Sequence, residues 1–187
     1  MSFIESMRAA TPKTKARFAG AVYFTYFILA FTGAAFDPHG AVARFLNVVS
    51  LAIYAVLTMI FYFMFKPVSK SVSLLAALTS LAGCIFSVMQ MLQLTRYVIS
   101  PLIFFGCYCL LLGQLVIHSG FLPRILGALL VVAGVGWLLF LFPFAKPLAT
   151  VTEVFGILAE GALCLWLLIA GVSPARAEKP TGGKKRA

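Results

Sequence analysis

Charged residues are scarce in this sequence: they fill 11% of its 187 positions, whereas a soluble domain usually carries about a quarter. Acidic residues are scarcer still, with 5 Asp and Glu against 15 Lys and Arg. Hydrophobic residues make up 62% of the chain, and the mean hydropathy is +1.03. This composition excludes an ordinary soluble domain, and it predicts that any activity resides in membrane-embedded parts of the chain.

The residues of metal and redox chemistry are also few. The two histidines, His39 and His118, are predicted on opposite sides of the membrane, too far apart to ligate one haem. The 4 cysteines include no Cys-x-x-Cys pair, so neither a zinc site nor a disulfide framework is indicated. His118 has Ser119 beside it but no carboxylate to orient it, so no catalytic triad is predicted. We expect no catalytic residue, no metal and no cofactor.

Apolar residues gather into long blocks. About 20 of them suffice to cross a hydrocarbon core of about 30 Å as a helix. The strands of a membrane barrel would instead alternate polar and apolar residues, which these blocks do not. The sequence therefore predicts an all-α integral membrane bundle of six transmembrane helices. The predicted spans are Phe18–Phe36, Phe45–Phe65, Val72–Leu94, Tyr97–Ile117, Leu122–Phe142 and Leu148–Val172.

Basic residues lie mainly at one set of block ends. If the N-terminus is inside, only Arg44, Arg96 and Lys146 of the 15 Lys and Arg fall outside. This positive-inside bias predicts that both termini are cytoplasmic. We expect these basic residues to meet anionic lipid headgroups and not nucleic acid.

The same pattern divides the chain into a cytoplasmic segment over residues 1–17, a transmembrane domain over 18–172 and a disordered basic tail over 173–187. The first apolar block has 19 residues, and the apolar core of a signal peptide has about 7–15. This length favours a retained first span.

Small and polar side chains mark predicted helix contacts. Gly106 and Gly113 share a face of the fourth span, as Gly127 and Gly134 do in the fifth, and we expect close packing there. More polar groups fall in the outer half of the spans, which also fits a water-accessible vestibule opening outward. The third span carries one stripe at helical spacing: Ser73, Ala76, Ala77, Ser80, Gly83, Cys84, Ser87 and Gln90.

Glu153 and Glu160 are the most informative residues. They are seven apart and are predicted to share a face of the sixth span, with Glu153 at the outer boundary and Glu160 near the midplane. An ionisable group at that depth is costly and marks a candidate functional site. We predict that Glu160 faces the bundle interior and bonds to side chains of similar depth, and that Glu153 pairs with Arg96. The expected partners of Glu160 are Tyr108, Ser87, Gln90 and Tyr54.

A second candidate site lies on the predicted inner side. Arg124 and His118 flank the turn before the fifth span, where the N-terminus of a helix favours anions. Lipid phosphate is the natural ligand of such a corner. The alternative is an arginine that only extends to the membrane surface.

The C-terminal part resembles a known family. The stretch "SGFLPRILG" at Ser119–Gly127, then Glu160, then "WLLIAGV" at Trp166–Val172, resembles a bacterial family of multi-span membrane proteins described as domain of unknown function 4386. The resemblance is best over Pro101–Val172. It implies a polytopic bacterial membrane protein and transfers no catalytic or binding residues.

Three functions fit these observations. The first is a non-enzymatic accessory or stress-related component of the bacterial cytoplasmic membrane. The second is a small transporter or channel that uses Glu160 and an outward-facing polar cavity. The third is an intramembrane enzyme that modifies a lipid. Association with a second copy or with another membrane protein stays open.

Overall fold

The computed structural model describes residues 11–37, 40–94, 100–139, 141–142 and 147–173. Within these residues the secondary structure consists of helices, without strands. They are α2 (Pro12–Ala34), α3 (Ala41–Phe65), α4 (Lys70–Met91), α5 (Pro101–Ser119), α6 (Arg124–Leu139) and α7 (Ala149–Ile169). The all-α class is therefore confirmed. Most of the predicted N-terminal segment and of the basic tail lies outside the described residues.

Polar residues at the block ends start three of the helices. The side chains of Thr11, Ser69 and Ser100 each accept a hydrogen bond from a backbone N–H in the first turn of α2, α4 and α5. Such caps satisfy amides that have no partner inside the helix. At the other end of α5, Gly120 adopts φ 69°, a left-handed conformation that suits glycine.

Five of the helices, all except α6, are long and apolar enough to cross a membrane. The remaining apolar helix, α6, has 16 residues and spans about 24 Å at 1.5 Å per residue, less than the predicted block Leu122–Phe142 would. The chain is a multi-pass membrane protein. The predicted starts shift most at three places: α2 begins at Pro12 and not at Phe18, α3 begins at Ala41 and not at Phe45, and α5 begins at Pro101 and not at Tyr97.

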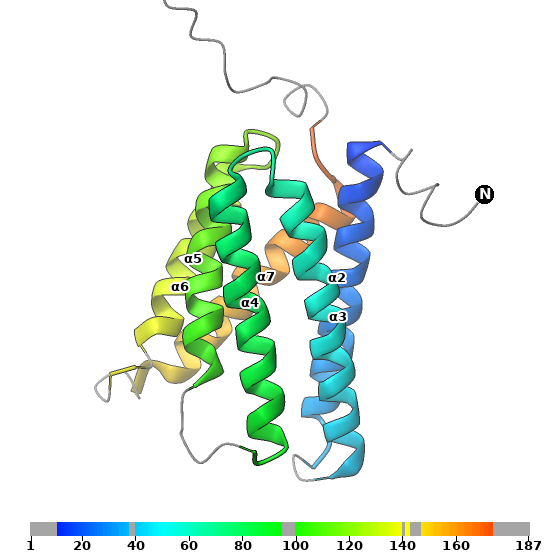
Figure 1. Ribbon diagram of the computed structural model, residues 1–187, viewed down its shortest axis with the longest axis vertical. Helices are drawn as coiled ribbons and strands as arrows, with labels where there is room; N and C mark the ends of the chain where they lie inside the picture. Colours follow the sequence, from blue (N-terminus) through cyan, green and yellow to red (C-terminus); the bar gives the residue numbers. More distant parts are fainter. Residues whose placement is uncertain (1–10, 38–39, 95–99, 140, 143–146, 174–187) are drawn as a thin grey trace, which may run out of the picture.

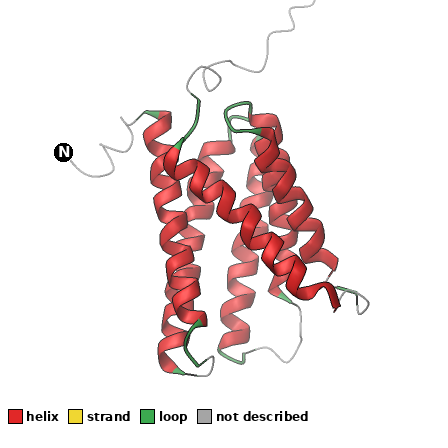
Figure 2. Cartoon of the chain, turned by 180° about the vertical axis from the view of Figure 1, so that it is seen from behind, coloured by secondary structure: helices red, strands yellow, loops and turns green. Residues whose placement is uncertain are grey.

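The helices form a closed ring in which each packs on the next and α7 returns to α2. Consecutive helices run antiparallel, so both described chain ends lie at one end of the bundle, the terminal end (Figure 1). The C-terminal ends of α2, α4 and α6 lie at the opposite end, the distal end. Helix α7 crosses the bundle obliquely, from α6 at the distal end to α2 at the terminal end (Figure 2).

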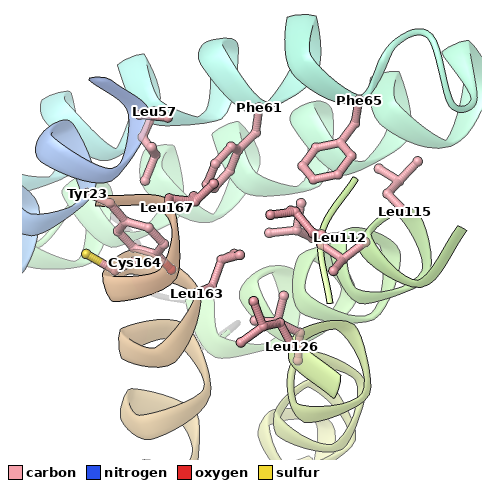
Figure 3. Packing of buried hydrophobic residues seen from close by; sticks show 14 of the residues in the cluster. Tyr23, Leu57, Phe61, Phe65, Leu112, Leu115, Leu126, Leu163, Cys164 and Leu167 are labelled. Carbon is pink, nitrogen blue, oxygen red and sulfur yellow. The ribbon is translucent and has the colours of Figure 1, made fainter. Parts of the chain in front are cut away.

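The apolar core lies mainly between the middle of the bundle and its terminal end. Phe65, Leu112 and Leu167, from three different helices, are each at most 2% exposed. Figure 3 shows how these side chains interlock with those of Leu57, Phe61 and Leu163. This half of the protein is therefore filled by side chains.

Glycines let α5 and α6 approach until their backbones touch. A Cβ added at Gly113 would lie 2.6 Å from the carbonyl oxygen of Gly127, and one added at Gly127 would lie 2.6 Å from that of Gly113. Gly106 and Gly134 face each other in the same way, at 3.1 Å and 2.8 Å. The close packing predicted from these four residues is confirmed, because only glycine fits at such distances.

Candidate functional site: a buried carboxyl and a polar pocket

The carboxyl group of Glu160 lies where α7 meets two other helices. The Tyr23 hydroxyl of α2 donates a hydrogen bond of 2.5 Å to Oε2 of Glu160. The Cys109 thiol of α5 donates to Oε1 across 3.8 Å, a length suited to sulfur. Glu160 is partly buried, and no Lys or Arg of the described chain pairs with it. The carboxyl therefore has two donors and no counter-ion.

Close contact of α2 with α7 brings Tyr23 to this carboxyl. A Cβ added at Gly20 would lie 2.4 Å from the backbone nitrogen of Leu168, so the two backbones nearly touch. The Cys164 thiol donates to the carbonyl oxygen of Gly20 across 3.6 Å. Near the terminal end, Arg17 donates to the carbonyl oxygen of Ile169 across 2.8 Å. Small residues in the middle and a cation at the end thus fix α7 against α2.

The ring of Tyr23, the partner of Glu160, belongs to a cluster of tyrosines. The ring centroids of Tyr23 and Tyr26 are 6.1 Å apart, and those of Tyr26 and Tyr54 are 4.7 Å apart. Tyr54 in turn packs edge-on against Tyr108 at 6.1 Å. These four tyrosines, the tyrosine cluster, come from α2, α3 and α5 and place phenol groups around Glu160.

One member of the tyrosine cluster has a polar atom without a partner. Tyr108 is only 2% exposed, and its buried hydroxyl makes no hydrogen bond. A buried polar atom left alone is costly, so it calls for a physical reason. The hydroxyl is a donor that the described arrangement of bonds does not use.

A pocket of about 500 Å³, called the polar pocket below, opens at the distal end of the bundle. Its described lining comes from α2, α3, α4 and the start of α5. The lining residues are Tyr26, Ala30, Asn47, Ser50, Leu51, Ser87, Gln90, Met91 and Pro101. None is a carboxylate, a histidine, a cysteine or a Lys or Arg. The polar side chains of this described lining are uncharged amides and hydroxyls.

The polar stripe of α4 divides into two parts. Towards the terminal end, Ser80 shares a hydrogen bond of 2.7 Å with Thr58, and Ser73 donates to the carbonyl oxygen of Tyr62 across 3.0 Å. These bonds join α4 to α3, in line with the interpretation as helix packing. Towards the distal end, Ser87 and Gln90 line the polar pocket, in line with the alternative of a cavity.

The hydrogen-bond partners predicted for Glu160 are wrong. The partners are Tyr23 and Cys109. Tyr108 was expected to bond to Glu160, and its hydroxyl is unpaired. The other expected partners, Tyr54, Ser87 and Gln90, lie in the tyrosine cluster or along the polar pocket. The prediction failed because it compared depths along parallel helices, and the oblique α7 brings Glu160 against a residue of α2 that depth counting had passed over.

The pairings expected of the other candidate residues stay predictions. Glu153 is exposed, and its predicted partner Arg96 lies outside the described residues. Arg124 and His118 are both exposed at the terminal end, and Nδ1 of His118 lies 2.8 Å from the carbonyl oxygen of Gln114. The lipid-phosphate corner stays a prediction. No group of three or more His, Cys, Asp or Glu in the described part of the chain could hold a metal ion.

Comparison with known proteins identifies a family for this chain but no activity. The family model for a domain of unknown function (DUF4386) matches residues 96–171. An uncharacterized protein of Archaeoglobus fulgidus is 34% identical over 116 residues, which cover 59% of this chain and 72% of that protein. No solved structure matches the chain. As the C-terminal resemblance predicts, the chain belongs to the DUF4386 family.

Proposed function

We propose that this DUF4386 protein is a non-enzymatic membrane protein that binds a small, uncharged, polar molecule in the pocket at its distal end. The observation that supports this proposal is the polar pocket itself. Its volume of about 500 Å³ lies within the range of about 300–1,000 Å³ common for small-molecule sites. Its occupant would lie against the amides of Asn47 and Gln90 and the hydroxyls of Ser50 and Ser87, which line the pocket.

The chemistry of the lining favours a neutral occupant. An amide or a hydroxyl both donates and accepts hydrogen bonds, so it suits alcohols, amides and sugars. A charged occupant would lose its water without meeting an opposite charge on the described lining, which is costly. An enzyme that modifies a lipid would need a nucleophile with a base beside it, and this lining offers no such base. The enzymatic alternative therefore has less support.

The other half of the bundle favours binding over open conduction. The cavity beneath, between Thr58, Tyr108 and Leu115, measures about 10 Å³, the room of about one water at most. The polar pocket is thus open at one end and closed at the other, unlike a channel. A carrier would need a second state in which the closed half opens. The identity of the molecule would decide between carriage and an accessory or stress-related role.

Charge supports an orientation with the termini in the cytoplasm. Within the described residues, the distal end carries Arg44, whereas the terminal end carries Lys13, Lys15, Arg17, Lys66, Lys70 and Arg124. In this orientation the polar pocket opens outward, and the basic end meets the anionic headgroups of the cytoplasmic leaflet. We propose the bacterial cytoplasmic membrane as the location of the protein.

A binding screen tests the proposal. Purified protein in detergent would be heated with each of a panel of polyols, sugars, amides and their charged analogues. We expect an uncharged compound to stabilise the fold, by about 2.7 kcal/mol when its concentration is 100 times the dissociation constant. Ser87→Leu, which places an apolar side chain in the pocket, should abolish the effect. Ser71→Leu, on an exposed face of the same helix, should keep it.

Two results would contradict the proposal. The first is stabilisation only by charged compounds, because the described lining cannot neutralise them. The second is a shift that survives Ser87→Leu, because the compound would then bind elsewhere.

A further inference from the structure

The carboxyl of Glu160 is held by neutral hydrogen-bond donors and not by a cation, unlike the carboxyl of a structural ion pair. Its two oxygens accept from the Tyr23 hydroxyl and the Cys109 thiol, on two other helices. No cation of the described chain balances a negative charge there. A carboxylate kept only for structure would be cheaper with a cation beside it, or replaced by an amide. Without a cation, only the two neutral donors stabilise a negative charge on Glu160.

The surroundings satisfy the carboxyl with or without its proton. The ionised form only accepts, and Tyr23 and Cys109 supply one donor to each oxygen. The neutral form has one O–H to donate, and the Tyr23 oxygen can accept it, since a phenol both donates and accepts. A glutamine would fill the same space but could not release a proton. The site therefore suits a proton that is bound at one time and released at another.

The route from this carboxyl to the polar pocket is short. Tyr23 lies one helical turn from Tyr26, and their ring centroids are 6.1 Å apart. Tyr26 is part of the pocket lining and packs on Tyr54 at 4.7 Å. A molecule that pushes on the Tyr26 ring therefore pushes on the partner of Glu160. Packed side chains transmit such shifts because the interior has little free space.

Tyr108 gives the cluster a second way to arrange its hydrogen bonds. Its unpaired hydroxyl lies in the same ring cluster, and its ring touches that of Tyr54. A buried donor without a partner raises the free energy of the described state. A rearrangement that engages Tyr108 recovers that free energy. The cluster is thus suited to two arrangements, and filling of the pocket can select between them.

We propose that Glu160, held by Tyr23 and Cys109, binds an exchangeable proton, and that this proton and the molecule in the polar pocket affect each other's binding through Tyr26. This inference rests on the proposed function and extends it towards a proton-coupled carrier. By linkage, if the molecule changes the affinity for the proton, the proton changes the affinity for the molecule by the same factor.

The other titratable groups in this core are phenols and thiols. They come from α2, α3, α4, α5 and α7, while α6 carries one titratable residue, Arg124, at its exposed start. The groups are Tyr23, Tyr26, Tyr54, Cys84, Tyr108, Cys109 and Cys164. Among the described residues, Glu160 is the carboxyl of this core, so an infrared band of a buried carboxyl can be assigned to it by substitution.

Infrared difference spectroscopy against pH tests the proton site. In the full-length protein we expect a carboxylic C=O band that appears as the pH falls. Glu160→Gln should remove this band, and Glu153→Gln, on an exposed position of the same helix, should keep it. Tyr23→Phe should shift the midpoint of the band and so provides a second readout if Glu160→Gln folds poorly. A band that does not change over the pH range in which the protein is folded would overturn the inference.

A filled pocket tests the coupling. Ser87→Cys, treated with the uncharged reagent N-ethylmaleimide, carries a bulky group in the polar pocket. Coupled sites typically affect each other 5- to 150-fold, so the midpoint of the Glu160 band should move by about 0.7–2.2 pH units. Treated Ser71→Cys and the treated parent, which share the native cysteines, should show no such shift.

The outcomes separate this inference from the proposed function. If no neutral compound stabilises the protein but the Glu160 band titrates and moves when the pocket is filled, the proton site and its coupling to the pocket stand, and the proposed uncharged solute fails. If a neutral compound binds but the band does not move in treated Ser87→Cys, solute binding stands and the coupling fails.

Discussion

Replacing Gly20 with alanine tests whether the contact between α2 and α7 holds the carboxyl site together. The new Cβ would lie 2.4 Å from the backbone nitrogen of Leu168 and 2.8 Å from the carbonyl carbon of Leu167. Backbone atoms cannot rotate away as a side chain can. Ordinary contact begins at 3.4 Å, so the two helices must separate locally by 1.0 Å, the difference between 3.4 and 2.4 Å. Overpacking of this kind costs about 1–3 kcal/mol.

The same separation acts on the bond between Tyr23 and Glu160. Tyr23 lies one turn beyond Gly20, and its bond of 2.5 Å would lengthen to about 3.5 Å, where a hydrogen bond is nearly lost. Losing a bond to a buried carboxyl adds about 1–3 kcal/mol. Alanine also favours a helix over glycine by about 1 kcal/mol, which offsets part of this loss. We therefore expect Gly20→Ala to lower the free energy of unfolding by about 1–5 kcal/mol, a large share of the about 5–15 kcal/mol of a typical domain.

Thermal unfolding in detergent measures this effect, with Gly161→Ala as the matched control. Gly161 lies beside Glu160 on α7, and a Cβ there meets no atom within 4 Å. Alanine also favours a helix over glycine by about 1 kcal/mol, so the control should unfold at the same temperature or a higher one. Equal unfolding temperatures for the two variants would refute the reasoning, because the two substitutions differ only in their contacts.

Three further predictions concern the polar groups and the topology. Tyr108→Phe should leave stability unchanged or raise it by about 1 kcal/mol in thermal unfolding, because it removes a buried hydroxyl that has no partner. Thr58→Val should lower stability by about 1–3 kcal/mol because it leaves Ser80, 0% exposed, without its bond, and adding Ser80→Ala should recover part of the loss. Reporter fusions at Ala187 and after Gly40 should report inside and outside respectively, and an outside result for Ala187 would contradict the predicted orientation.

Helix number and order could be predicted because they depend on block length and hydropathy. The block ends were less accurate because capping competes with hydropathy there. At α5 the apolar residues before Ser100 suggested a start at Tyr97, but the cap of Ser100 and the fixed backbone of Pro101 begin the helix later. At α2 the cap of Thr11 begins the helix among charged residues, so its first turns are less apolar than the predicted span.

Contacts that follow from helix periodicity were also within reach of the sequence. The glycines of α5 and α6 are seven apart on each helix, and a short turn makes the two helices antiparallel neighbours. Gly106 must then meet Gly134, and Gly113 must meet Gly127, as the structure shows. Such an argument needs neighbouring helices with a known register, which the α5–α6 hairpin supplies.

The partners of Glu160 depend on two quantities that hydropathy does not contain, the tilt of α7 and the rotation of each helix about its axis. Neighbouring residues on a helix point about 100° apart, so Cys109 bonds to the carboxyl while the ring of Tyr108 packs against that of Tyr54. The tilt is fixed where small residues let α7 touch α2. The sequence does carry a sign of this contact: Gly20 lies three residues before Tyr23, and Cys164 lies four residues after Glu160. These two spacings place a small residue and a polar residue on one face of each helix. They therefore predict the bond between Tyr23 and Glu160 better than a comparison of residue depths in the membrane does.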